Sequence, residues 1–148
     1  YRSKKGILVR DGHPVIEAYE KAGVMTWELL NRWPAVCVTA GMKDGGAKSV
    51  EGRRVGVVLP YFLTVPYVVA RTDFTFEGPL ITLRRFMMDS QFQFRILPMP
   101  EESGPFEPRL VWHHCSHTDP FLQWVRGLVV DAARSEARLL GVIDTSEE

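Results

Sequence analysis

The sequence predicts an α/β fold, in which a sheet carries helices on both of its faces. Short apolar or β-branched runs alternate along the chain with segments whose apolar residues recur at helical spacing. The 148 residues suffice for one compact domain and are too few for two of ordinary size. Apolar residues make up 45% of the chain, which is typical of globular rather than disordered proteins.

Strands are expected where short apolar runs end at turn-forming residues. The first run stops at the cluster Asp11-Gly12-His13-Pro14, and two later runs stop at Pro60 and Pro98. The run after Pro34 is rich in β-branched residues. Strands are therefore predicted over residues 7–10, 35–39, 53–59, 73–76, 92–97 and 109–114.

Helices are expected where a capping side chain precedes an apolar run of helical period. Thr26 can cap a helix that ends before Pro34, and Thr64 can cap a helix over residues 65–71. Residues 80–87 also have helical spacing. A last helix is expected to reach about residue 140, with Asp119 as its N-cap and Pro120 at its first helical position. Residues 15–23 are ambiguous and could form a helical turn or two around residues 17–21, and residues 41–52 are expected to form an exposed loop.

The balance of charges argues against direct DNA binding by this chain. Eighteen basic residues match eighteen acidic ones, whereas duplex DNA is held largely by clustered Lys and Arg. The two cysteines, Cys37 and Cys115, lie far apart and form no disulfide framework, which suits a reducing compartment such as the cytoplasm. No apolar run approaches the ~20 residues of a membrane helix, so no membrane partner is expected.

The most informative stretch is LVWHHCSHTDPFLQWVRGL, at residues 110–128. It resembles the closing signature of LysR-type transcriptional regulators, in their aromatic-catabolism and nodulation branch. There a strand ending Leu-x-Trp-His leads into a helix that begins Asp-Pro-x-x-x-Trp-Leu-Arg. Val125 stands here where Leu is usual, and the remaining signature positions are filled by Trp112, His113, Asp119, Pro120, Trp124 and Arg126.

Three further segments resemble the effector domain of the same family in the same order. Residues 8–14 resemble its Val-Arg-x-Gly-His-Pro segment, residues 57–63 its strand-to-helix corner, and residues 68–73 the helix end before its next strand. The chain also departs from the family: residues 15–24 are longer than the usual link, and the loop after Thr39 is shorter. Glu77 and Gly78 are unexpected, and Tyr61 replaces a common His.

The resemblance implies a periplasmic-binding-protein-like (type 2) fold of two α/β lobes, each with a mixed, mostly parallel sheet, and a small molecule in the cleft between them. By position, residues 1–115 would be the second lobe, and residues 116–148 a helix of the first lobe with a frayed tail. The chain would be a fragment of a longer polypeptide, and only an N-terminal helix-turn-helix outside it would contact DNA. This interpretation requires residues 7–10 and 109–114 to lie side by side as crossover strands.

Five residues are the candidate ligand contacts for a small organic anion, with aromatic acids as the first candidates. The His13 imidazole can bind an anion near the hinge, or it can instead satisfy local backbone groups. Tyr61, Phe62 and Thr64 lie where a strand meets a helix N-terminus, which favours a carboxylate. In the alternative, Phe62 and Leu63 belong to the core and Tyr61 is a half-exposed ring. Thr39 follows a strand at the end where open α/β sheets bind ligands.

A rival constellation consists of His113, His114, Cys115 and His117, and a metal-dependent enzyme could use the imidazole and thiol groups of His113, Cys115 and His117 to hold zinc. Neighbouring residues on a strand point to opposite faces, which disfavours such a site. No G-x-S-x-G, P-loop or G-x-G-x-x-G motif is present, so we expect no enzyme and no cofactor. The helix after Asp119 has an apolar face that should pack on a second copy or fold back on its own lobe, and a lobe kept only as a dimerisation scaffold is a further alternative.

Overall fold

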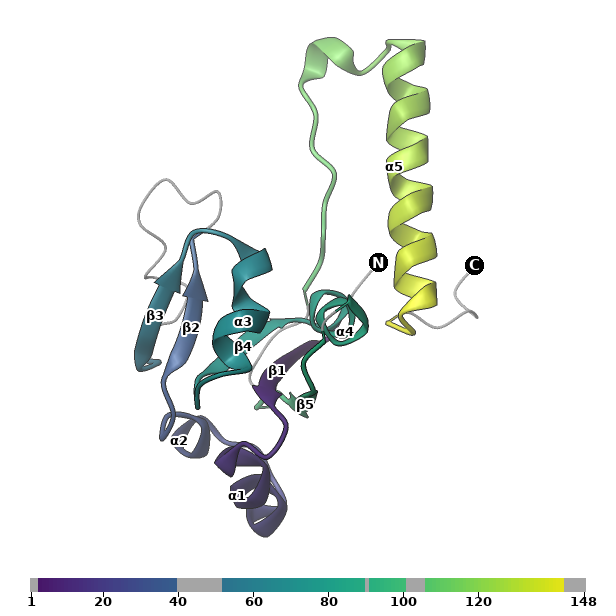
Figure 1. Ribbon diagram of the computed structural model, residues 1–148. Helices are drawn as coiled ribbons and strands as arrows, with labels where there is room; N and C mark the ends of the chain where they lie inside the picture. The colour runs from purple at the N-terminus through teal and green to yellow at the C-terminus, as the bar shows by residue number, and fades with distance from the viewer. Residues whose placement is uncertain (1–2, 40–51, 90, 101–105, 143–148) are drawn as a thin grey trace.

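The structure is a computed structural model, and it describes residues 3–39, 52–89, 91–100 and 106–142. A five-stranded sheet in the order β3-β2-β4-β1-β5 lies at its centre, with helices on both faces (Figure 1). The strands are β1 (Lys5–Arg10), β2 (Ala35–Val38), β3 (Val55–Leu59), β4 (Thr75–Pro79) and β5 (Phe94–Pro98). The helices are α1 (Pro14–Ala22), α2 (Trp27–Leu30), α3 (Val65–Val69), α4 (Leu80–Asp89) and α5 (Pro120–Leu139), with the 3-10 turns η2 (Phe62–Thr64) and η3 (His114–Ser116). The predicted α/β class is confirmed.

The sheet is mixed, as predicted, and its strand directions decide which loops meet. β2 pairs in parallel with both β3 and β4, whereas β1 runs antiparallel to β4 and β5. The carboxyl ends of β2, β3 and β4 therefore lie together at one end of the sheet, which we name the carboxyl edge. The carboxyl end of β1, which leads into α1, lies at the opposite end (Figure 1).

Two hydrophobic clusters cover the two faces of the sheet. Alternate residues of a strand point to opposite faces, so Ile7 and Val9 join the cluster under α1 and α2, while Leu8 joins the one under α3 and α4. Leu30 from α2 and Val65 from α3 are both fully buried, one in each cluster. The amphipathic helices are thus held by burial of their apolar faces, which is the main source of helical stability in proteins.

The expected strand at residues 109–114 was wrong. The described residues 107–113 are extended, exposed and outside the sheet, although their apolar run is typical of a strand. Both edges of β1 are already hydrogen-bonded, to β4 and to β5, so the required pairing of residues 7–10 with 109–114 is not made. Instead, an isolated antiparallel bridge just before β1 joins Ser3 to Phe106. The N–H of each residue donates to the carbonyl of the other at 2.8 Å.

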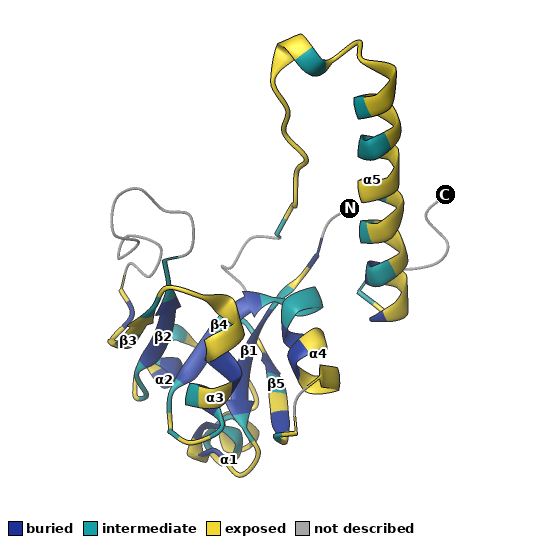
Figure 2. Ribbon diagram, turned by 45° about the horizontal axis from the view of Figure 1, so that its top comes forward, coloured by how far each residue is buried: buried dark blue, intermediate teal, exposed yellow. Residues whose placement is uncertain are grey.

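α5 forms as predicted, because Asp119 accepts a hydrogen bond from the Leu122 N–H at 3.0 Å and Pro120 follows it. Most of the helix stands away from the lobe and is exposed (Figure 2). Its last turn folds back on the lobe: Ala137 and Leu140 are buried, and Arg84 of α4 donates to the Leu140 carbonyl. Neither α5 nor any other helix in the described parts of the chain is long and apolar enough to cross a membrane.

The predicted loop at residues 41–52 and the predicted frayed tail lie outside the described residues, apart from Gly52. The ambiguous segment 15–23 is helical throughout most of its length, as α1.

Candidate functional site

Four of the five predicted ligand residues lie at the carboxyl edge. Thr39 follows β2, and its N–H donates to the Leu59 carbonyl at the end of β3 at 3.0 Å. Tyr61 and Phe62 follow β3, and their side chains are 67% and 43% exposed. The Phe62 ring meets the buried ring of Phe76 edge to face, with centroids 6.3 Å apart. The edge therefore presents two accessible aromatic rings, of which Phe62 packs on the core, a surface suited to an apolar or aromatic ligand.

The helix start at this edge differs from the prediction, because Thr64 does not cap α3. Its backbone is already helical, and its hydroxyl donates to the Tyr61 carbonyl at 2.7 Å. The turn η2 precedes α3, so the N–H groups of Thr64 and Val65 donate to the carbonyls of Tyr61 and Phe62. These N–H groups are therefore engaged within the turn, and the expected carboxylate site on a free helix N-terminus is not supported.

Positive charge enters the carboxyl edge from another element. Lys4 precedes β1 and Lys5 is its first residue, opposite Pro79 at the carboxyl end of β4. The Lys4 carbonyl accepts a hydrogen bond from the N–H of Leu80 at 2.9 Å, which ties this segment to the start of α4. The sequence did not single out these lysines, because their place at the carboxyl edge depends on the antiparallel pairing of β1 with β4; β4 and β2 lie between them and the end of β3.

His13 lies at the opposite end of the sheet from the other four candidates. It is the N-cap of α1, where its Nδ1 accepts the N–H of Val15 at 2.9 Å, and it is 1% exposed. Its ring meets the Trp33 ring edge to face, with centroids 5.6 Å apart. Burial of the ring lowers the pKa of His13 below its ordinary value. A backbone hydrogen bond and the negative charge of Asp73 raise the pKa, but by less than burial lowers it. The geometry favours the alternative in which His13 satisfies local backbone groups.

The sequence analysis missed a buried ion pair near the amino ends of β3 and β4, away from the carboxyl edge. The Arg53 side chain is 2% exposed, and its Nε lies 2.5 Å from Oε1 of Glu77. Its two terminal nitrogens donate to Asn31 Oδ1 and Thr75 Oγ1, each at 2.7 Å. The signal was present in the sequence, because Glu77 departs from the family pattern inside a strand and a buried carboxylate needs a partner.

The rival histidine cluster forms a compact turn around η3. His113 Nδ1 lies 3.0 Å from Cys115 Sγ, but the His117 ring lies parallel to the Trp112 ring and accepts from its indole N–H at 3.3 Å. The Arg126 guanidinium lies over the Trp112 ring, with its Cζ 4.8 Å from the ring centroid. Among the residues that the structure describes, no three His, Cys, Asp or Glu side chains converge on a metal site.

A groove of about 610 Å³ opens between α3 and α4, beside the carboxyl edge. Leu63, Tyr67 and Phe92 line it, and the Tyr67 and Phe92 rings meet edge to face at 5.6 Å. Its rim carries Arg85 and Asp89, which pair with each other. Its charged groups are thus engaged within the protein, and they offer less to an anion than the carboxyl edge does.

Comparison with known proteins gives two relatives with the same name. The HTH-type transcriptional regulator SyrM of Rhizobium meliloti (strain 1021) is 31% identical over 77 residues, which cover 52% of this chain and 23% of that protein. SyrM 1 of Sinorhizobium fredii (strain NBRC 101917 / NGR234) is 26% identical over 141 residues, which cover 90% of this chain and 39% of that protein. This chain is a relative of the LysR-type transcriptional regulators. No protein-family model matches it.

Solved structures of LysR-type regulatory domains show the same fold. The regulatory domain of MexT, a transcriptional activator in Pseudomonas aeruginosa, superposes with a TM-score of 0.63 at 21% identity, over 97% of this chain and 65% of that one. A putative transcriptional regulator from Vibrio parahaemolyticus superposes with a TM-score of 0.64 at 17% identity, over 95% and 63% of the two chains. The periplasmic-binding-protein-like lobe is confirmed, and the relatives named here are regulators rather than enzymes.

Proposed function

We propose that the chain is the second lobe of the effector-sensing domain of a LysR-type regulator, and that it binds a small organic anion at the carboxyl edge. Aromatic acids are the first candidates. The observation that carries the proposal is the parallel pairing of β2 with β3, which brings Thr39, Tyr61, Phe62 and Thr64 to one end of the sheet. Ligands of open α/β sheets bind at the carboxyl ends of the strands.

The expected pairing of residues 7–10 with 109–114 is not made, so the two-lobe proposal rests instead on the contact of Ser3 with Phe106. The Ser3–Phe106 contact precedes β1, whose first residues lie opposite the end of β4, so the chain enters and leaves the sheet beside the carboxyl edge. Residues 107–113 extend away from that edge and lead into α5 (Figure 1). A first lobe attached through these segments would face Tyr61 and Phe62. We keep the division into residues 1–115 and 116–148 as part of this proposal, although the hydrogen-bonded part of the second lobe ends at Phe106.

In this proposal the anion shifts the balance between two arrangements of the lobes, and the whole regulator couples that shift to DNA. DNA would be contacted only through a helix-turn-helix outside this chain. The regulator would act in the cytoplasm as a homo-oligomer. The Lys4 and Lys5 ammonium groups would supply the positive charge, the Tyr61 and Phe62 rings the apolar wall, and the threonine hydroxyls the orienting polar contacts.

Thermal titration of the regulator's two-lobe effector domain with benzoate and salicylate tests the proposal. A ligand at 100 times its dissociation constant should stabilise the domain by about 2.7 kcal/mol. Tyr61→Ala should weaken the best acid about tenfold, the order of one well-placed aromatic contact. Tyr67→Ala is the matched control, since Tyr67 is an exposed ring on α3 outside the carboxyl edge. Equal loss in both variants, or no thermal shift with any small organic acid, would contradict the proposed site.

A further inference from the structure

A second hollow lies at the other end of the lobe, between α1 and α2. These two helices form a short hairpin: Gly23 ends α1 in the left-handed conformation (φ 72°), and Thr26 caps α2 by accepting from the Leu29 N–H at 3.1 Å. The groove between them has a volume of about 480 Å³, within the range of small-molecule sites. It lies along residues 15–24, the segment that the sequence analysis expects to be longer than the family's usual link.

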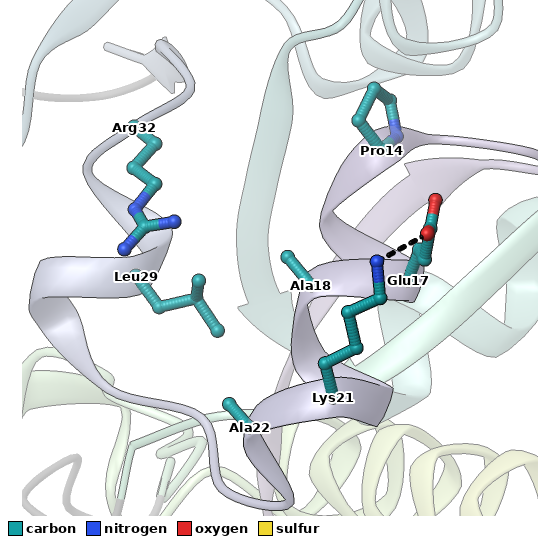
Figure 3. Close-up of a pocket in the computed structure, with 7 residues that line it drawn as sticks. All are labelled: Pro14, Glu17, Ala18, Lys21, Ala22, Leu29 and Arg32. Carbon is teal, nitrogen blue, oxygen red and sulfur yellow. Dashed lines mark hydrogen bonds and ion pairs between the residues drawn. The ribbon is translucent and has the colours of Figure 1, made fainter.

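The floor of this groove is apolar and built from small residues. Pro14, Ala18 and Ala22 follow one another at intervals of four residues, which places them on one face of α1. Figure 3 shows Ala18 and Ala22 pointing toward Leu29 of α2 across the groove. Leu29 is 7% exposed and belongs to the hydrophobic cluster on that face. Because the two alanines are short, the space above Leu29 stays open.

The walls carry an excess of positive charge. Arg32, which follows α2, lines one wall, and Lys21 and Glu17 of α1 line the other (Figure 3). Lys21 Nζ lies 2.6 Å from Glu17 Oε1, and this partner holds the pKa of Glu17 below its ordinary value. The Arg32 guanidinium makes no hydrogen bond or ion pair with another described side chain. The groove thus carries two cations, Lys21 and Arg32, against the single carboxylate of Glu17, and the Arg32 guanidinium is available to a ligand.

We propose that this groove binds a small organic anion with an unbranched apolar body, such as a medium-chain carboxylate. Its carboxylate would pair with the Arg32 guanidinium, which can donate two parallel hydrogen bonds, and its alkyl chain would lie on Ala18, Ala22 and Leu29. The groove and the carboxyl edge lie at opposite ends of the sheet, because α1 follows the carboxyl end of β1, which is antiparallel to β4. The site is therefore separate from the one proposed above, and either can fail without the other.

Titration of the ¹⁵N-labelled 148-residue chain with sodium hexanoate tests the proposal. The amide signals of Ala18, Ala22 and Leu29 should shift, with half-saturation on the order of 1–10 mM for a ligand of this size. Hexylammonium carries the same alkyl chain with the opposite charge, and inorganic phosphate carries the charge without the chain. Both should shift these signals at least about fivefold less at equal concentration.

Variants separate the contributions of charge and shape. Arg32→Ala should weaken hexanoate binding about tenfold, while Arg134→Ala, which removes an exposed arginine of α5, should leave it unchanged. Ala22→Leu should fill the groove and weaken binding. Glu17→Gln removes the opposing carboxylate and should tighten binding about two- to threefold, a gain that loss of folding cannot produce. The proposal is overturned if hexanoate shifts no groove signals, if phosphate or hexylammonium acts equally, or if the shifts are confined to Tyr61 and Phe62.

Discussion

Removal of the Glu77 carboxylate tests the buried ion pair that the structure places between β4 and the segment before β3. Arg53 is 2% exposed at its side chain and Glu77 is 22% exposed. In Glu77→Leu the Arg53 guanidinium keeps its bonds to Asn31 and Thr75 but loses its only described carboxylate partner. Its charge then remains buried without compensation, which is the costly outcome for a buried pair.

The expected cost follows from the burial of the two groups. Breaking a buried pair from one side costs about 3–5 kcal/mol in general. Glu77 is partly reached by water and Arg53 keeps two neutral acceptors, so we expect the lower end, about 3 kcal/mol. Replacing both groups, as in Arg53→Met with Glu77→Leu, removes the uncompensated charge and should restore most of that loss. The coupling between the two sites should therefore be on the order of 2 kcal/mol.

Urea unfolding followed by tryptophan fluorescence measures these free energies for the four members of the cycle. A loss of about 3 kcal/mol in a chain of this size should lower Tm by about 10 °C. Glu17→Gln is the matched control, because Glu17 belongs to an exposed pair on α1 and should cause no measurable change. A loss of stability in Glu77→Leu no larger than in the control, or a double variant as unstable as Glu77→Leu alone, would contradict a buried, energetically coupled pair.

Three further outcomes are expected. Burial lowers the pKa of His13 below its ordinary 6.5, so the unfolded chain binds more protons and the stability of the fold decreases as the pH drops below 6.5. His13→Asn keeps a capping acceptor that does not titrate, so this variant should lose less stability than the parent chain between pH 7.5 and 5.5. Equal losses of the two proteins in urea unfolding would contradict this. Asp119→Ala should cost about 1 kcal/mol at the first turn of α5, seen as about fivefold faster hydrogen exchange there, and unchanged exchange would refute the cap. Arg84→Ala removes the donor to the carbonyls of Leu140 and Gly141 and should speed exchange in the last turn of α5, whereas Arg134→Ala should not; a similar rise in both would rule out a specific role for Arg84.

Local interactions made several elements readable from the sequence alone. The Asp119 and Thr26 caps form with N–H groups three residues further along the chain, so the residues that form each cap are neighbours in the sequence. The continuous apolar run at residues 7–9 likewise predicted a short buried strand, and it forms the buried part of β1. The family resemblance rested on such local runs, and it named the fold correctly.

Tertiary structure decided the features that depend on distant partners. The run at residues 109–114 has the composition of a strand, but a strand exists only when a neighbour offers a hydrogen-bonding edge, and both edges of β1 were occupied. Thr64 could have capped α3, yet the turn η2 placed it inside the helical path.

The candidate site divides in the same way. The sequence identified Tyr61 and Phe62 as candidate ligand contacts where a strand meets a helix, but only the strand directions placed Thr39 beside them and His13 at the far end of the sheet. Arg53 and Glu77 are 24 residues apart, and their pairing depends on how β4, α2 and the segment before β3 pack together. Short-range patterns therefore determined which elements form, whereas the direction and order of the strands determined which side chains meet, because those depend on hydrogen bonds between segments far apart in the chain.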